Sequence, residues 1–146
     1  MPIAFNGSGT ISGISTGGIS DTKAVADAAM PAGAILQVVQ TVKSDVSTIS
    51  IATTALSSDI MTVSITPQSA SSKILLQCSL NTSCGTTSVG FVFQRDSTDI
   101  GIADAAGSRQ RRTSSQTAPS GTVVNLNSSF LDSPSTTSAI TYRVKA

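Results

Sequence analysis

The segment Ile140-Thr141-Tyr142-Arg143-Val144-Lys145 alternates apolar and polar side chains at every position. Successive side chains of a β-strand point to opposite faces of its sheet. The even-numbered residues of this segment therefore share an apolar face, and the odd-numbered residues share a polar one. Strands with one apolar and one polar face are typical of antiparallel sheets, in which one side covers the core and the other meets water.

The same period of two recurs along the rest of the chain. Odd positions are apolar in residues 61–66 and 89–93, and even positions are apolar in residues 74–80 and, less regularly, 124–130. Turn-forming residues separate these segments. Further strand candidates are residues 35–42, 46–51 and 100–103. About eight short strands are therefore expected in residues 34–146, and two sheets packed face to face, as in a jelly roll, fit the pattern best.

Residues 1–33 have a different composition and are expected to form an attachment arm. Glycines alternate with single apolar residues there, a pattern that cannot build a core within one chain. A helix of about two turns is expected before Pro31, with Ser20 or Asp21 as its N-cap. The arm residues expected to bind a partner are Ile3, Phe5, Ile11, Ile14 and Ile19.

Composition excludes much of enzyme chemistry. The 146 residues contain no His, Glu or Trp, whereas Ser and Thr together number 45. Without His, the base of a catalytic triad and the commonest metal ligand are missing, so no enzyme activity and no cofactor are expected. The net charge of +1 gives no reason to expect nucleic acid as a partner. No apolar run approaches the length of a membrane span, and the first ten residues do not resemble a secretory leader.

Three arginines, Arg109, Arg111 and Arg112, form the only basic cluster of the sequence. They are not interleaved with aromatic residues, which disfavours a nucleic-acid site. They form either a solvated loop or a contact with carboxylates on a neighbouring subunit or on another protein of an assembly.

Other candidate sites have simpler interpretations. Asp96, Asp99 and Asp104 lie close enough in sequence to hold a hard cation, but turn formation is the simpler interpretation. Cys78 and Cys84 are too few for a disulfide framework and are expected to be reduced thiols. Cys78 lies on an apolar strand face and is expected in the core.

The sequence favours neither a Ser–Lys hydrolase nor a glycan receptor. A Ser–Lys hydrolase would need a lysine such as Lys73 as its base, although a hydrated lysine beside a strand is the simpler interpretation. A glycan platform would need exposed aromatic rings. The four aromatic residues outside the arm fall on apolar strand faces and are expected in the core, which disfavours glycan binding; they are Phe91, Phe93, Phe130 and Tyr142.

Several motifs, in this order and spacing, resemble those of small phage virion proteins, which are often described as tail-fibre or structural proteins of phages of aquatic bacteria. The resemblance covers nearly the whole chain. It rests on residues 6–14 (NGSGTISGI), 35–40 (ILQVVQ), 64–67 (SITP), 71–75 (SSKIL) and 100–109 (IGIADAAGSR).

This resemblance implies a virion location, a homotrimer, and a β-rich head behind a short attachment segment, with other capsid or tail proteins as partners. It implies no catalytic residues. The function expected is that of a capsid decoration protein or short fibre anchored by its arm. The alternative is a tail-fibre or head-fibre knob whose loops, such as residues 81–88 and 108–120, contact the host surface.

Overall fold

The structure, a computed structural model, describes residues 33–46, 48–49, 56, 59–83, 85, 88–117 and 119–146. It has two units, residues 1–38 and residues 39–146. The predicted helix before Pro31 and the apolar arm residues Ile3, Phe5, Ile11, Ile14 and Ile19 lie outside the described residues. The boundary expected between residues 33 and 34 therefore stays a prediction.

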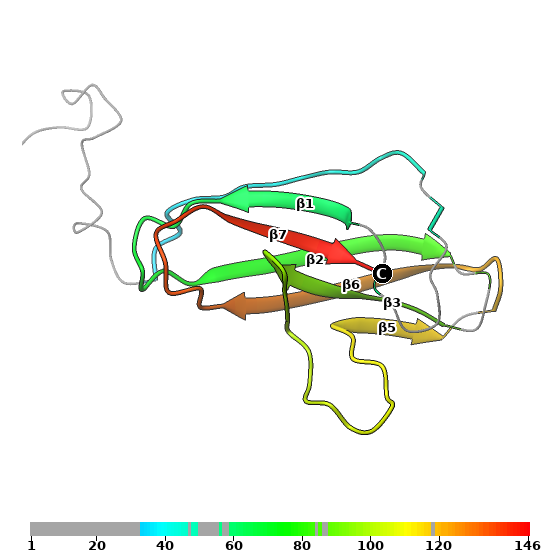
Figure 1. Cartoon of the computed structure of the whole chain (residues 1–146). Coiled ribbons are helices and arrows are strands. Elements are labelled where there is room, and N and C mark those ends of the chain that lie inside the picture. Colours follow the sequence, from blue (N-terminus) through cyan, green and yellow to red (C-terminus); the bar gives the residue numbers. More distant parts are fainter. Residues whose placement is uncertain are drawn as a thin grey trace, which may run out of the picture. The chain divides into compact units, whose positions relative to one another are not determined.

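The described residues are all-β, and every strand pairing between them is antiparallel (Figure 1). They include no helix of the length and hydropathy that a membrane span requires. The seven strands of this part of the chain are β1 (Asp59–Ile65), β2 (Ile74–Ser83), β3 (Ser88–Arg95), β4 (Thr98–Ile100), β5 (Ser114–Thr117), β6 (Val123–Asp132) and β7 (Ile140–Lys145). The count agrees roughly with the expected eight.

The strands form two sheets with a nested pattern of pairing. In the larger sheet the order is β1-β7-β3-β4, with β5 also paired to β3, and the smaller sheet contains only β2 and β6. The first strand thus pairs with the last, the second with the second-last, and the third with the third-last. Nested pairing of this kind arises when one long antiparallel hairpin is rolled up so that its successive pairs fall in different sheets.

Both sheets contribute to one core. Its buried members from the larger sheet are Phe91, Phe93, Ile140, Tyr142 and Val144, and those from the smaller sheet are Leu76 and Leu126. The rings of Phe91 and Phe93 meet edge to face at 5.3 Å, an arrangement that aromatic pairs favour. The aromatic residues predicted for the core are confirmed there, with Phe130 partly buried at its margin, and Cys78 also packs against the cluster.

The strand β3 is flanked on one side by two short strands in succession. Residues Phe93–Arg95 pair with β4, residues Ser88–Phe91 pair with β5, and residues 101–113 between these strands leave the sheet. Thr113 supplies hydrogen bonds to β3 at the interruption between β4 and β5. Its hydroxyl accepts a hydrogen bond from the Phe93 N–H at 2.9 Å and donates one to the Ile100 carbonyl at 3.4 Å. Its own N–H donates to the Phe91 carbonyl at 2.9 Å.

Three details of the expected strand pattern were wrong. Residues 35–42 have no strand pairing with other described residues. Of the strand expected at residues 46–51, only residues 46, 48 and 49 are described, and they are unpaired, so that strand stays a prediction. The strand expected at residues 100–103 instead ends at Ile100, because the chain turns away at Gly101, where φ is +63°. The strand β5 was missed, since its sequence Ser-Ser-Gln-Thr has no apolar alternation. Backbone hydrogen bonds to β3, rather than burial of side chains, define it.

Candidate functional site

The outer face of the β2–β6 sheet is uncharged over its full length. Each of the two strands contributes ten residues, and they pair in register from Ile74↔Asp132 to Ser83↔Val123. The side chains facing outward are Leu75, Gln77, Ser79, Asn81 and Ser83 from β2, and Val123, Asn125, Asn127, Ser129 and Leu131 from β6. Amides and hydroxyls thus occupy the centre of the face and apolar residues its ends.

The central amides are ordered by hydrogen bonds across the two strands. The Asn125 Nδ2 donates to Asn81 Oδ1 at 2.8 Å and to Ser79 Oγ at 3.2 Å, and the Asn127 amide donates to Asn125 Oδ1. These bonds are exposed, so each contributes little to stability. They do fix the amide orientations, which gives the face a regular pattern of donors and acceptors.

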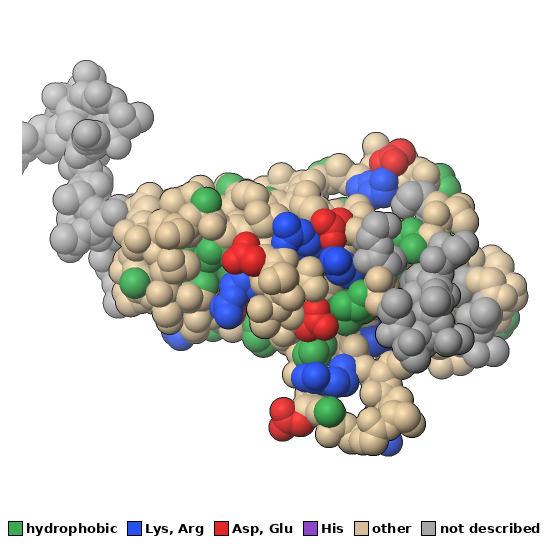
Figure 2. Space-filling model, viewed as in Figure 1, with side chains coloured by type: hydrophobic (Ala, Val, Ile, Leu, Met, Phe, Trp, Pro, Cys, Tyr) green, Lys and Arg blue, Asp and Glu red, His purple; other side chains and the backbone are tan. Residues whose placement is uncertain are grey.

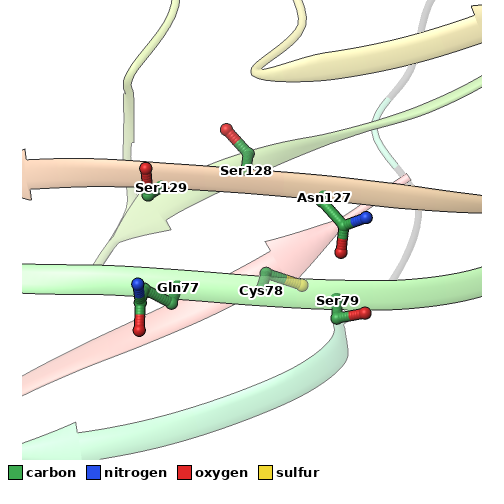
Figure 3. Close-up of a pocket in the computed structure, with 6 residues that line it drawn as sticks. All are labelled: Gln77, Cys78, Ser79, Asn127, Ser128 and Ser129. Atoms are coloured by element: carbon green, nitrogen blue, oxygen red, sulfur yellow. The ribbon is translucent and has the colours of Figure 1, made fainter.

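A hollow lies in the middle of the same sheet and is lined by Gln77, Cys78, Ser79, Asn127, Ser128 and Ser129. Figure 3 shows that these side chains point in different directions from β2 and β6 and do not converge on one point. The hollow contains hydroxyl, amide and thiol groups but no acid or general base. Its thiol belongs to Cys78, and burial raises the pKa of that thiol. A raised pKa disfavours the thiolate, so Cys78 suits packing better than nucleophilic attack.

The three clustered arginines lie in or just after the excursion between β4 and β5. Arg111 donates from Nε to the Ala103 carbonyl at 2.6 Å, and Arg112 donates to the Gly90 carbonyl and to Gln110 Oε1. Arg109 and Arg112 line a second hollow together with Ser88 and Ser115. Within the described part of the chain, none of the three arginines forms an ion pair with a carboxylate.

The position of Arg112 depends on a glycine in β3. A Cβ at Gly90 would lie 2.6 Å from Arg112 Cδ and 2.6 Å from the Ser114 carbonyl oxygen. The backbone contact is the decisive one, because β5 would have to move to relieve it. Gly90 therefore allows the Arg112 side chain to lie across β3. This role cannot be predicted from the sequence, because a glycine within a strand has several possible causes.

The expected aspartate cluster does not form a cation site in the structure. Asp96 has a φ of +51° in the two-residue turn between β3 and β4, a conformation that aspartate tolerates in such turns. Its Oδ1 accepts the Thr141 N–H at 3.0 Å, and Asp99 accepts a hydrogen bond from Gln94. No group of three or more acidic, His or Cys side chains in the described residues is placed to hold a metal ion.

Lys73 does contact a serine. Its Nζ donates to Ser133 Oγ at 3.0 Å, across the ends of β2 and β6, and both groups are exposed. A lysine that acts as a general base needs a lowered pKa, which burial or a neighbouring positive charge provides. The Lys73–Ser133 contact therefore has the distance of a Ser–Lys pair without its burial.

A buried polar network joins the two sheets and was not foreseen from the sequence. Asp132 at the end of β6 is only 6% exposed. It accepts two hydrogen bonds from Arg95 Nη1, at 2.9 and 3.0 Å, and one from the Tyr142 hydroxyl at 2.7 Å. The signal was present, since a tyrosine expected in the core needs a partner for its hydroxyl. Aspartate at the end of a strand is, however, also typical of a turn, so the sequence alone does not identify Asp132 as this partner.

Because of this network, the free energy of unfolding is expected to fall at alkaline pH. Burial, followed by the hydrogen bond and negative charge of Asp132, raises the pKa of Tyr142 above its ordinary value. The unfolded chain releases this proton from about pH 10 upward, whereas the folded protein retains it. The contribution of Tyr142 to stability is therefore complete below about pH 10 and is lost as the pH rises further.

Tyr142 is the only tyrosine, and the chain has no Trp, so phenolate absorbance reports this one group. We expect the native protein to form phenolate at a higher pH than the protein unfolded in urea. We also expect the unfolding free energy to fall more steeply above pH 10 in the wild type than in Tyr142→Phe, which separates this effect from lysine titration. Identical native and unfolded absorbance titrations would contradict the assignment.

Large apolar side chains are exposed in two places. Six of the nine such residues in the described part lie in residues 35–46, and the other three are Leu75, Val123 and Leu131 of the β2–β6 sheet. Figure 2 shows that uncharged polar groups and backbone cover most of the visible face, with basic and acidic side chains next to one another near its middle.

The inter-subunit role expected for Arg109, Arg111 and Arg112 stays a prediction, as does the resemblance to phage virion proteins. The observations that bear on function are the uncharged β2–β6 face, the exposed segment 35–46 and the three arginines, which have no carboxylate partner among the residues that the structure describes. Comparison of the chain with protein-family models, with curated proteins and with solved structures found no match.

Proposed function

We propose that this protein is a structural component of a bacteriophage particle, without enzyme activity or cofactor. In this proposal it is a homotrimeric capsid decoration protein or short fibre, anchored to capsid or tail proteins by residues 1–33. The observation that carries the proposal is the exposure of six large apolar residues within residues 35–46. A segment of this kind is unfavourable in a monomer in water and becomes favourable when a neighbouring subunit covers it.

The topology is consistent with this role. We propose that the nested pairing of β1 with β7, β2 with β6 and β3 with β5 is that of a jelly roll in which the second sheet is reduced to two strands. The jelly roll is a recurrent fold of viral capsid proteins. Fold alone does not assign a function, so the fold supports the proposal only together with the uncovered surface.

The arm provides the test of particle binding. Deletion of residues 1–20 is expected to leave the strands folded, because all seven described strands begin after residue 58. The truncated protein is expected to be lost from the particle, since the apolar residues proposed to bind other virion proteins are removed. Far-UV circular dichroism checks the fold, and mass spectrometry of purified particles of the encoding phage measures incorporation. Normal incorporation of the truncated protein would contradict the anchoring role.

A second candidate function is a receptor-binding knob, favoured by one observation. Arg109, Arg111 and Arg112 lack carboxylate partners in the described part, on an excursion that leaves the sheet. Such a loop is suited to bind an acidic group on another molecule. Purified wild-type protein would then block adsorption of the phage to its host, and a variant with Arg109 and Arg112 replaced by Gln would not. A decoration protein would leave adsorption unchanged in both cases.

A further inference from the structure

We propose that residues 34–42 of one copy add as a strand to the free edge of β6 in a second copy. The inference rests on the proposed assembly of several copies and identifies the surfaces that would meet. It assigns a binding partner to the exposed apolar segment and to the smaller of the two sheets.

The donor segment has the composition of a strand but no ladder. Residues 34–42 read Ala-Ile-Leu-Gln-Val-Val-Gln-Thr-Val, without charge and rich in β-branched residues, which favour strands. None of these nine residues is paired, and Figure 1 draws them without a strand arrow. Ile35 and Val38 are each 80% exposed and Val42 is 76% exposed. The segment thus has no ladder among the described residues and leaves Ile35, Val38 and Val42 largely exposed, whereas Leu36 and Val39 are only about 40% exposed.

The acceptor is the smaller sheet, which contains only two strands. Because β2 and β6 pair only with each other, each has one edge without a ladder among the described residues. Unpaired edges of this length are a ready template for another chain. The sheet is also narrower than the one it faces, in which β1, β7 and β3 lie side by side with β4 and β5. An added strand would extend it toward the same width.

One feature favours the β6 edge over the β2 edge. The exposed apolar residues Val123 and Leu131 stand at the two ends of β6, whereas β2 has only Leu75. Both strands have inward-facing residues that are only partly buried and that an added strand would cover further. Each strand also has ten residues and spans about 33 Å, so the nine-residue segment, about 30 Å long, matches either edge in length.

Side-chain alternation gives the added strand an orientation. Over residues 35–42, one face of the extended segment has three apolar residues of four, and the other has two of four. The first face contains Leu36, Val38, Gln40 and Val42, and the second contains Ile35, Gln37, Val39 and Thr41. The more apolar face is expected to turn toward the core beside Phe130, and the face with Gln37 to continue the uncharged outer surface of β6. A shift by one residue would exchange the two faces, so burial selects this orientation.

A second copy is the occupant because every copy then donates one segment and accepts one. Contacts of this head-to-tail kind close into a ring when the rotation between copies permits. Each β6 edge is covered in such a ring. Neither the segment nor the β6 strand carries a charge apart from Asp132, which is bound within its own chain, so no charge must be buried on docking.

Disulfide trapping tests this pairing between two distinguishable chains. In a background with Cys78→Ala and Cys84→Ala, one tagged chain carries Gln37→Cys, Val39→Cys or Thr41→Cys, so that three positions sample the register. A second chain with a larger tag carries Asn127→Cys on β6. The matched control carries Ser79→Cys, because Ser79 is the cross-strand partner of Asn127 on β2 and lies one strand farther from the proposed neighbour. The chains are co-expressed, oxidised mildly and separated without reductant.

At least one donor position is expected to form the mixed-tag dimer with Asn127→Cys, at a yield at least tenfold above Ser79→Cys. Equal yields for the two acceptors, or a higher yield for Ser79→Cys, would overturn the choice of β6. If one chain carrying both cysteines cross-links only within itself, the second copy is excluded.

The oligomeric state of the wild type separates the two proposals. Oligomers that sediment normally but give no mixed-tag dimer would overturn this pairing and leave the proposed assembly standing. A wild-type protein that sediments as a monomer and is absent from purified particles would overturn the proposed function itself.

Discussion

Replacement of Asp132 by alanine is expected to lower the free energy of unfolding by about 3 kcal/mol. The substitution leaves the Tyr142 hydroxyl without its acceptor in the core and removes the carboxylate that balances Arg95. Loss of one partner from a buried ion pair typically costs about 3–5 kcal/mol. The lower end applies here because the Arg95 side chain is 30% exposed and regains some water.

Equilibrium unfolding in urea, followed by far-UV circular dichroism, measures this effect. Asp132→Asn is the control, since its amide oxygen still accepts a hydrogen bond while the charge is lost, and it is expected to cost roughly half as much. The double variant Asp132→Ala with Tyr142→Phe should be less destabilised than the sum of its parts, because the unpartnered hydroxyl is removed too. Additive effects would show that the two groups do not act together.

Phe91→Ala is expected to cost about 4 kcal/mol, within the range seen when a buried aromatic side chain is removed. Phe91 is 0% exposed and packs edge to face on Phe93. The chain contains only five aromatic residues, so few other large rings are present to fill the space. Against a total stability of about 5–15 kcal/mol for a domain, the variant is expected to be partly unfolded at 37 °C.

Two substitutions control for this prediction. Phe91→Leu keeps most of the apolar volume and is expected to cost about 1–2 kcal/mol. Phe130→Ala removes the same side chain from a partly exposed site, where the loss is expected to be smaller. Thermal unfolding of the three variants ranks them directly. A larger effect at Phe130 than at Phe91 would mean that the centre of the core lies elsewhere.

The sequence predicts strands well where one face is buried and the other wet. The alternation at residues 61–66, 74–80 and 140–145 identifies β1, β2 and β7, because burial imposes a period of two on the side chains. The strand β5 escapes such a prediction because its sequence, Ser-Ser-Gln-Thr, is polar throughout. At residues 35–42 the error is the opposite one, because a strand is predicted where none forms among the described residues. An apolar pattern shows that a segment favours a strand but not that a pairing partner is available.

The candidate site can likewise be predicted only where its residues form a local pattern in the sequence. The arginine cluster is visible in the sequence because its members lie close together. Its hydrogen bonds to Ala103 and Gly90, which lie 8 and 22 residues away from the arginines that bind them, have no such local pattern. The Arg95–Asp132–Tyr142 network joins three strands and has no local pattern at all. Contacts between distant residues depend on the order of strands in the sheets, which side-chain periodicity does not specify.

The hydrogen bonds of the Thr113 hydroxyl affect where insertions and deletions can be tolerated in this sequence. The Thr113 hydroxyl bonds to Phe93 of β3 and to Ile100 of β4 at the point where the excursion rejoins the sheet. The hydrogen bonds of the sheet therefore do not depend on how many residues precede Thr113 in the excursion or on which residues they are. Related chains can therefore gain or lose residues there at small thermodynamic cost, since loop entropy grows only slowly with length. The excursion is accordingly a natural place for a foreign peptide to be inserted and displayed.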